Sequence, residues 1–340
     1  TKLPMKRRAD DTAAPTVAFL LPASPPPVLL ELLRGIDTSE VLFIKHDDSV
    51  PGDDVSIAGV AWVPGAPAAR LTSVLDAHSE VRWVHSMSAG VDYLSDVIKD
   101  RLRYSPVALT NGRGAFSSSL AEYAIAAVLH FNKQFKRCED NRRQKKWDKF
   151  MMDTVAGKTL GFLGWGHIAK STAALAGPLG LRLVALRRNL SKMSEDLPHS
   201  LEALYGPDDA LTFYAQCDYV LCSLPLTDES RAVVDETAFS AMKTTAVFIS
   251  LGRGAVVDEV ALHAALTTGQ IRGAACDVFT TEPLPEASPL WDCEDLLITA
   301  HNADLTDDYW ALAVQTWREN LACFLRGAPL ATPVDKARGY

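Results

Sequence analysis

The sequence predicts an α/β protein with two doubly wound domains, and three observations support this fold class. Short apolar runs with the length of buried parallel strands alternate with amphipathic segments along the chain. One such run, Thr159–Leu163, leads through a glycine turn and a helical segment to a second run, Leu181–Leu186, and the whole has the size of one βαβ unit. The chain of 340 residues is long enough for two domains.

The first third of the chain predicts a smaller sheet with its own helices. Helices are expected at Val28–Leu33, which proline precedes, and at Ala68–Ala77. Five apolar runs are the expected strands: Thr16–Leu21, Val41–Ile44, Gly59–Val63, Val81–Val84 and Pro106–Thr110.

A long helix is expected to carry the chain from the first domain into the second. Ser119 and Glu122 form a capping-box pattern, which predicts the helix N-terminus at Ser119. Apolar residues at helical spacing extend this helix to Phe135. The basic run from Gln134 to Lys149 is interrupted by acidic residues, and we interpret it as a solvated face.

The second domain is expected to contain six strands, the number in a complete doubly wound nucleotide-binding sheet. These strands are Thr159–Leu163, Leu181–Leu186, Tyr219–Leu224, Ala246–Ser250, Gly273–Val278 and Leu296–Thr299. A final helix over Asp304–Leu325 should return to the first domain. The expected domains are therefore 1–118 with 303–340 and 119–302, with the site in the cleft between them.

The turn Gly164-x-Gly166-x-x-Ala169 has the spacing of a dinucleotide-binding fingerprint. Its glycines permit a tight turn and a close approach to a pyrophosphate, and the helix N-terminus offers amides to the phosphates. A small-residue turn in another doubly wound sheet is the alternative. The apolar face of the helix is expected at Ile168, Thr172, Leu175 and Leu179. The expected cofactor contacts here are Gly164, Trp165, Gly166, His167 and Ile168.

The end of the next strand indicates which cofactor is bound. An NAD site places Asp or Glu about 20 residues after the glycines, whereas this strand ends in Arg187 and Arg188, with Lys192 nearby and no acidic residue before Glu195. Guanidinium groups can bind a 2′-phosphate that a carboxylate would repel. NADP(H) is therefore expected, with NAD(H) as the second option. The alternative is that both arginines are ordinary surface residues.

Three later strand ends carry the residue types that carbonyl reduction needs. They are Arg253, Glu282 and His301, and the carboxyl ends of parallel strands share one edge of a sheet. An imidazole can deliver a proton near neutral pH, a carboxylate can fix its tautomer, and a guanidinium can stabilise the developing negative charge. Taken singly, each residue has an ordinary structural explanation.

Five motifs together resemble the D-isomer-specific 2-hydroxyacid dehydrogenase family over nearly the full chain. They are Gly157–Gly161 with the glycine turn, Cys217–Thr227, Gly252–Gly254 with Val257-Asp258, Asp277–Pro285, and His301. The resemblance implies two Rossmann-like domains, the nucleotide-binding domain being inserted into a smaller flavodoxin-like substrate domain. Asn111–Ser117 and the pair Arg187-Arg188 are similar to the glyoxylate/hydroxypyruvate reductase side of the family. Departures at Ser250 and Asn302 leave the substrate open.

The resemblance also implies a role for each site residue. His301 would exchange the proton, Glu282 would be its partner, and Arg253 would bind and polarise the substrate. Backbone amides of Ser88, Ala89, Gly90 and Val91 would bind the substrate carboxylate. Further cofactor contacts are expected at Leu224, Pro225, Leu251 and Asp277. The expected reaction is reduction of small 2-oxo acids to D-2-hydroxy acids by NADPH. A homodimer formed through the helix Ser119–Phe135 is expected.

Composition excludes several other classes of function. The net charge is −8, so a nucleic-acid partner is not expected, and no apolar run has the length of a membrane span. The six cysteines form no C-x-x-C pair, which indicates thiols in a reducing, cytoplasmic setting and no metal site. Two alternatives stay open: an NAD-dependent phosphoglycerate-type dehydrogenase, and a corepressor-like module that senses dinucleotides.

Overall fold

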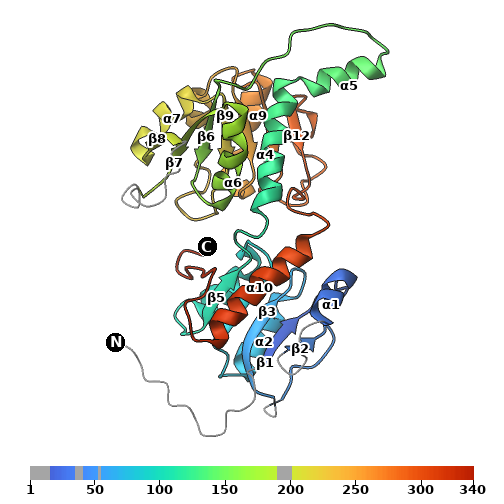
Figure 1. The fold of residues 1–340 in the computed structure, drawn as a ribbon, viewed down its shortest axis with the longest axis vertical. Helices are drawn as coiled ribbons and strands as arrows, with labels where there is room; N and C mark the ends of the chain where they lie inside the picture. Colours follow the sequence, from blue (N-terminus) through green and yellow to red (C-terminus); the bar gives the residue numbers. More distant parts are fainter. Residues whose placement is uncertain (1–15, 35–40, 53–54, 190–200) are drawn as a thin grey trace. The chain divides into compact units, whose positions relative to one another are not determined.

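A computed structural model of the chain describes residues 16–34, 41–52, 55–189 and 201–340. Two compact units are present. Unit 1 comprises the described residues up to Phe116 together with Asp307–Tyr340, and unit 2 comprises Ser117–Thr306. Each unit has a parallel sheet covered by helices, which confirms the predicted fold class (Figure 1).

Unit 1 contains a five-stranded sheet in the order β2-β1-β3-β4-β5. Its strands are β1 (Thr16–Leu20), β2 (Val41–Ile44), β3 (Ile57–Trp62), β4 (Trp83–Ser86) and β5 (Ala108–Asn111). The helical elements are α1 (Pro27–Arg34), α2 (Ala68–Ala77), η1 (Asp92–Leu94), α3 (Ser95–Val97), η2 (Ile98–Leu102) and α10 (Tyr309–Leu325). Because a parallel sheet is covered on both faces, its central strands are buried, as β3 is along its whole length.

The last helix, α10, begins later than the sequence predicts. Residues 304–308 are not helical, and Leu305, which was expected on the apolar face, is 60% exposed. The helix starts at Tyr309, whose ring stacks on Phe116 at 4.3 Å between centroids. Trp317 in the middle of α10 is fully buried and packs against Phe19 of β1 at 4.7 Å. Thus α10 completes the core of unit 1 from the far end of the chain.

The described residues of unit 2 form seven parallel strands, so the expectation of six is wrong. The order is β12-β11-β10-β9-β6-β7-β8. The strands are β6 (Thr159–Leu163), β7 (Arg182–Leu186), β8 (Leu201–Tyr205), β9 (Tyr219–Cys222), β10 (Val247–Ser250), β11 (Gly273–Cys276) and β12 (Leu296–Ile298). The missed strand, β8, is half-exposed at the sheet edge and contains Leu, Glu and Ala, which favour helices over strands.

The helix that opens unit 2 differs from its prediction at both ends. α4 runs from Ser117 to Asn132, so Ser119 lies within its first turn and is not the N-cap. The helix stops because Gln134 adopts the left-handed conformation, with a φ of 52°. A separate helix, α5 (Phe135–Arg143), follows. The single helix to Phe135 is therefore two helices with a break between them.

The remaining helices of unit 2 cover the two faces of the sheet. They are α6 (His167–Ala176), η3 (Gly177–Leu179), η4 (Pro207–Asp209), α7 (Ala210–Gln216), α8 (Glu236–Ala241), η5 (Gly254–Val256), α9 (Glu259–Thr267) and η6 (Pro289–Asp292). The buried face of α6 consists of Ala169, Thr172, Ala173 and Ala176. Leu175 and Leu179 are 42% and 37% exposed, so the predicted apolar face is wrong at these two positions.

The segment Phe135–Phe150, called here the arm, extends from the body of unit 2 (Figure 1). Its charges pair with one another: Arg142 contacts Glu139 at 2.7 Å, and Arg137 contacts Asp148 at 2.7 Å. This agrees with the interpretation of the basic run as a solvated face.

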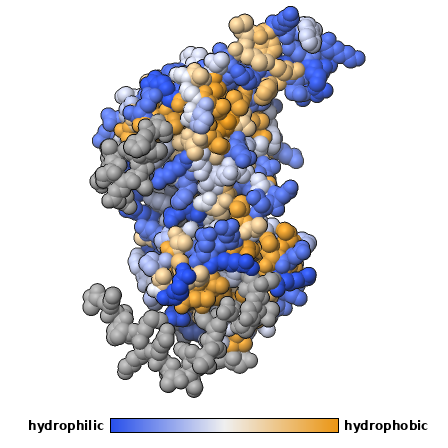
Figure 2. All heavy atoms as spheres, in the orientation of Figure 1, coloured by the Kyte–Doolittle hydropathy of each residue, from blue (hydrophilic) through white to orange (hydrophobic). Residues whose placement is uncertain are grey.

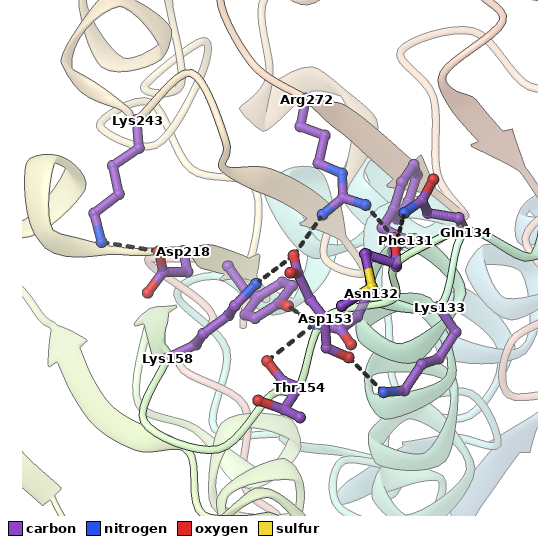
Figure 3. A network of polar contacts seen from close by, with 12 residues as sticks. Phe131, Asn132, Lys133, Gln134, Asp153, Thr154, Lys158, Asp218, Lys243 and Arg272 are labelled. Carbon is purple, nitrogen blue, oxygen red and sulfur yellow. Dashed lines mark hydrogen bonds and ion pairs between the residues drawn. The ribbon is translucent and has the colours of Figure 1, made fainter. Parts of the chain in front are cut away.

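Polar contacts attach the base of the arm to the body of unit 2 (Figure 3). Asn132 Nδ2 donates to the Thr154 carbonyl at 3.3 Å, and Lys133 donates to the Asp153 carbonyl. The Asp153 carboxylate pairs with Lys158 at 3.0 Å. These contacts join the end of α4 to the segment that precedes β6.

Candidate active site

The glycine turn connects β6 to α6 as the fingerprint predicts. Gly164 has a φ of +94°, which side-chain-bearing residues rarely adopt, and Gly166 precedes the first helical residue, His167. Nothing lies within 4 Å of the place where a Cβ of Gly166 would be, and the residue is exposed. Trp165 is buried, and its ring centroid lies 5.2 Å from that of Phe162, so its side chain anchors the turn in the core of unit 2. The turn thus presents backbone amides and open space at a helix N-terminus.

Arg187 and Arg188 directly follow β7 at the carboxyl edge of the sheet. The structure also brings an acid there that sequence reasoning missed. Glu229, from the loop after β9, lies 3.7 Å from Arg188, and both side chains are largely exposed. Lys192 lies outside the described residues.

The three residues predicted to be catalytic follow neighbouring strands of unit 2. Arg253 follows β10, Glu282 follows β11 and His301 follows β12. His301 Nδ1 lies 2.7 Å from Glu282 Oε2, and about a third of each side chain is exposed. The structure therefore pairs the imidazole with the carboxylate, as expected for a general acid/base with its partner.

Glu282 is held by a second contact. Its other oxygen, Oε1, accepts a hydrogen bond from the Phe279 amide at 2.9 Å. With both oxygens engaged, the carboxylate points at the imidazole and selects the tautomer in which Nδ1 carries a proton. Nε2 is then the ring nitrogen that can exchange a proton with a substrate.

The loops that carry Arg253 and Glu282 are in direct backbone contact. A Cβ at Gly254 would lie 1.8 Å from the Phe279 carbonyl carbon and 2.3 Å from the Thr280 nitrogen. Glycine is the one residue type that permits this approach. The Gly-Arg-Gly motif therefore fixes the distance between the arginine loop and the loop that orients Glu282.

Asp277 was expected to contact the cofactor, but its carboxylate is engaged by the protein. The residue is 2% exposed and accepts hydrogen bonds from Thr299 Oγ1 at 2.6 Å and from the amides of Asn302 and Ala303 at 3.1 and 3.2 Å. This geometry favours a role in shaping the histidine loop.

The other residues expected near the cofactor occupy the same carboxyl edge. Leu224 and Pro225 are half-buried after β9, and Leu251 is buried after β10. A Cβ at Gly252 would lie 2.4 Å from the Leu224 carbonyl oxygen, so these two loops are also tightly packed.

The loop Ser88–Val91 follows β4 in unit 1, and its carbonyl groups are used within that unit. The Ser88 carbonyl accepts from the Gly112 amide at 2.9 Å, the Ala89 carbonyl from Asn111 Nδ2 at 2.5 Å, and the Gly90 carbonyl from Ser88 Oγ at 2.8 Å. Within the described ranges, none of the four amides donates to another group of the chain. Backbone amides in such a turn can bind an anion.

The structure adds residues that sequence reasoning did not assign to the site. Ser119 contacts Ala303, Tyr123 contacts Thr299, and Thr299 contacts Asp277. Asp304 is half-buried three residues after His301, and burial raises the pKa of its carboxyl, while the charges of His301 and Arg253 lower it. No local pattern indicates these contacts, because each joins residues far apart in the sequence or follows a loop conformation.

A separate cavity of about 530 Å³ lies at the amino ends of β11 and β12, beside the arm. Some of its charged residues pair with one another, as Lys136 does with Asp140 and Glu294. The cavity is therefore distinct from the candidate active site at the carboxyl ends. The described part of the chain contains no cluster of three potential metal ligands and no helix long and apolar enough to cross a membrane.

Comparison with known proteins places this geometry in one family. Residues 125–303 match the model of the D-isomer specific 2-hydroxyacid dehydrogenase, NAD binding domain. A glyoxylate reductase of Korarchaeum cryptofilum is 30% identical over 311 residues, which cover 86% of this chain and 90% of the relative. A glyoxylate/hydroxypyruvate reductase B of Enterobacter sp. is 31% identical over 278 residues, 80% of this chain and 83% of that protein.

Solved structures agree with the sequence relatives. A D-isomer specific 2-hydroxyacid dehydrogenase from Xanthobacter autotrophicus Py2, in complex with NADPH and MES, has a TM-score of 0.82 and 26% identity, covering 96% of this chain and 100% of that one. An NADPH-dependent glyoxylate/hydroxypyruvate reductase from Sinorhizobium meliloti, with NADP and sulfate, shares the fold with a TM-score of 0.79, 23% identity and coverage of 96% and 100%. The family model and these relatives thus show that this chain belongs to the D-isomer specific 2-hydroxyacid dehydrogenase family.

Proposed function

We propose that the chain is an NADP(H)-preferring reductase that converts small 2-oxo acids into D-2-hydroxy acids. The observation that carries this proposal is the 2.7 Å contact between His301 and Glu282, next to the loop of Arg253. The same unit contains the dinucleotide-type glycine turn between β6 and α6. Family membership and the reductase names of the relatives support the reaction class.

His301 has the role of general acid in this proposal. When bound, the cofactor supplies a hydride to the carbonyl carbon, and the carbonyl oxygen gains negative charge. Nε2 of His301 donates a proton to that oxygen, while Glu282 on Nδ1 stabilises the positive charge of the imidazolium ring. The Arg253 guanidinium binds the substrate carboxylate and polarises the carbonyl.

Unit 2 provides a suitable place for the cofactor phosphates. The open space beside Gly166 and the N-terminus of α6 can accept a pyrophosphate. Arg187 and Arg188 would hold the 2′-phosphate, which would replace Glu229 as the partner of Arg188. The bound NADPH named for the Xanthobacter relative supports this preference. Leu224, Pro225 and Leu251 would border the nicotinamide half.

The loop Ser88–Val91 of unit 1 is proposed to bind the carboxylate of a 2-oxo acid. The inward-turned carbonyls leave its amides for an anion. In this assignment unit 2 binds the cofactor and unit 1 supplies a substrate-binding loop.

One observation favours an NAD-dependent member as the second candidate. Glu229 lies beside Arg188 and could accept hydrogen bonds from the ribose hydroxyls of NAD, which is the role of an acid in such sites. A phosphoglycerate-type dehydrogenase is the form that this alternative takes.

We also propose that the protein is a homodimer. The arm exposes Trp147 at 91%, and Met151 at its base is 89% exposed, while Leu175 of α6 and Leu179 of η3 are partly exposed. Apolar side chains also gather on the face of unit 2 that carries α4 and α6 (Figure 2). Exposed aromatic and apolar groups of this kind favour an interface with a second copy. Sedimentation velocity should give twice the chain mass, and Trp147→Ser should shift the equilibrium toward monomer.

The six free cysteines of the chain suit a reducing compartment. Burial raises the pKa of the Cys222 thiol to about 12, so this thiol stays protonated and unreactive. We therefore expect the protein in the cytoplasm.

The test of the proposed function is a panel of 2-oxo acids with NADPH and with NADH. Consumption of the reduced cofactor is followed with glyoxylate, hydroxypyruvate, and branched and aromatic 2-oxo acids. We expect turnover of small 2-oxo acids with a lower KM for NADPH than for NADH. No turnover with any acid would contradict the proposal, and a preference for NADH would favour the second candidate.

A further inference from the structure

The backbone of His301 adopts a conformation that needs support from its surroundings. Its φ is 51°, in the left-handed region that non-glycine residues rarely occupy. Such conformations persist where neighbouring groups hold them, and they concentrate at functional sites. The His301 amide donates to the Asp277 carbonyl at 2.8 Å, which is the first of these holding contacts.

The Asp277 carboxylate holds the chain on both sides of His301. Thr299, two residues before the histidine, donates its hydroxyl to Oδ1 at 2.6 Å. The amides of Asn302 and Ala303, directly after it, donate to the same carboxylate at 3.1 and 3.2 Å. One buried anion therefore connects both flanks of the histidine.

Helix α4 contacts this arrangement at two points. Tyr123 OH lies 2.9 Å from Thr299 Oγ1, and Ser119 Oγ donates to the Ala303 carbonyl at 2.5 Å. Ser119 can make this contact because it lies within the first turn of α4 and does not cap the helix. The residues joined by these two contacts are 176 and 184 positions apart in the sequence.

The direction of these hydrogen bonds follows from the groups involved. An ionised carboxylate can only accept, so the single hydroxyl hydrogen of Thr299 goes to Asp277. Tyr123 must then donate to Thr299. Burial raises the pKa of Tyr123 to about 12, so the phenol keeps its hydrogen and remains the donor. The result is a directed chain from Tyr123 through Thr299 to Asp277.

We propose that Tyr123 and Ser119 are positioning residues, which hold the loop 299–303 through Thr299, Asp277 and Ala303 so that His301 faces Glu282. The inference rests on the proposed function in that His301 is the proton-exchanging group. Neither residue needs to touch the substrate or the cofactor, since both act on the backbone that carries the imidazole. Their removal should slow the chemical step and loosen the loop.

The central test uses Tyr123→Phe, which removes one hydroxyl and keeps the ring. We expect kcat to fall about tenfold, with cofactor Kd unchanged, because the Thr299 hydroxyl oxygen loses the hydrogen bond that Tyr123 donates to it. In the protein without cofactor or substrate, the amides of Asn302 and Ala303 should exchange with deuterium faster. Tyr104→Phe, the same change at a tyrosine that is 90% exposed in unit 1, is the matched control and should alter neither quantity.

Two variants at Thr299 test whether Tyr123 acts through this residue. Thr299→Ser keeps the hydroxyl and should retain most activity, whereas Thr299→Val should lower kcat. If the chain of hydrogen bonds is the route, Tyr123→Phe should add little to Thr299→Val in the double variant. Full additivity of the two losses would contradict a route through Thr299.

The outcomes separate this inference from the proposed function. Unchanged kcat together with unchanged amide exchange in Tyr123→Phe would overturn the positioning role. A loss of cofactor binding in parallel with a lower unfolding temperature would also overturn it, because it would show a general structural role. If the unmodified protein reduces no 2-oxo acid, the proposed function fails. Amide exchange at Asn302 and Ala303 then still tests the positioning role, which requires faster exchange in Tyr123→Phe than in the unmodified protein.

Discussion

The two sheets of this protein share a parallel, helix-covered architecture, yet their histidines have opposite surroundings. His85 in β4 of unit 1 is fully buried, and its Nδ1 contacts the Thr110 hydroxyl at 2.8 Å. His301 after β12 of unit 2 is about a third exposed and contacts a carboxylate. Burial lowers the pKa of His85 to about 3, which keeps it neutral. The difference teaches that loop position and partner, more than the fold, decide which histidine can exchange a proton.

The loops at the two sheet edges differ in the same way. In unit 1 the side chains of Ser86 and Ser88 contact each other, and Ser88 bonds to a carbonyl of its own loop. In unit 2 the pair of Glu282 and His301 stays partly exposed. Four changes would break or sharpen this comparison.

The largest expected effect is on turnover. His301→Gln should lower kcat by about 10²- to 10⁴-fold, because general acid catalysis contributes on that scale. NADPH binding, followed by fluorescence, should be retained. His263→Gln, the same change on α9 of unit 2, is the control and should leave kcat unaltered. A loss smaller than tenfold in His301→Gln would remove the histidine from the mechanism.

The next effect concerns the contact between the loop of Arg253 and the loop of Glu282. Gly254→Ala places a methyl group 1.8 Å from the Phe279 carbonyl carbon, so backbone must move. We expect the free energy of unfolding to fall by on the order of 3 kcal/mol, as for severe overpacking. Gly177→Ala is the matched control, since nothing lies within 4 Å of its Cβ position. Urea unfolding of both variants measures the difference, and similar midpoints would show that the loops can separate freely.

A third effect concerns cofactor choice at the end of β7. Replacing Arg187 and Arg188 together by Ala should raise the KM for NADPH at least about 10- to 100-fold and change the KM for NADH little, because the loss of a single hydrogen bond to a charged group costs about 1.5–3 kcal/mol. Arg182→Ala, an exposed arginine at the opposite end of the same strand, is the control. An unchanged ratio of the two KM values would exclude a 2′-phosphate site here.

The smallest effect concerns stability and pH. The pKa of His85 is lowered from 6.5 to about 3, so between these values the unfolded chain binds a proton that the folded chain does not. The free energy of unfolding therefore falls as the pH drops below 6.5, by at most about 1.4 kcal/mol per pH unit from this group.

His85→Asn removes this titration and keeps a polar group near Thr110. Urea midpoints at one pH above 6.5 and at two below it should show a smaller decline for the variant than for the unmodified protein. An equal decline in both proteins would show that His85 does not cause it.

Local patterns were sufficient for most elements. Apolar runs and the glycine turn predict β6, α6 and β7, because strand length, helical period and glycine at the turn are properties of neighbouring residues. The helix break at Gln134 was missed, since the apolar spacing continues to Phe135. β8 was missed because its residues favour a helix, and they form a strand only through parallel pairing with β7.

The candidate residues Arg253, Glu282 and His301 could be predicted from the sequence alone. They follow successive strands, and parallel strands bring their carboxyl ends to one edge. The placement of Glu229 beside Arg188 could not be predicted, because it depends on the path of the loop after β9.

By itself the sequence determined the fold class, the glycine turn and the order of the three candidate residues, since each follows from local periodicity or from strand order. Only the tertiary structure decided that Asp277 holds the histidine loop and that α4 reaches it through Ser119 and Tyr123. The physical reason is that hydrogen-bond partners are chosen by distance and direction after packing. A carboxylate near a cofactor motif has no partner until the loops that surround it have folded.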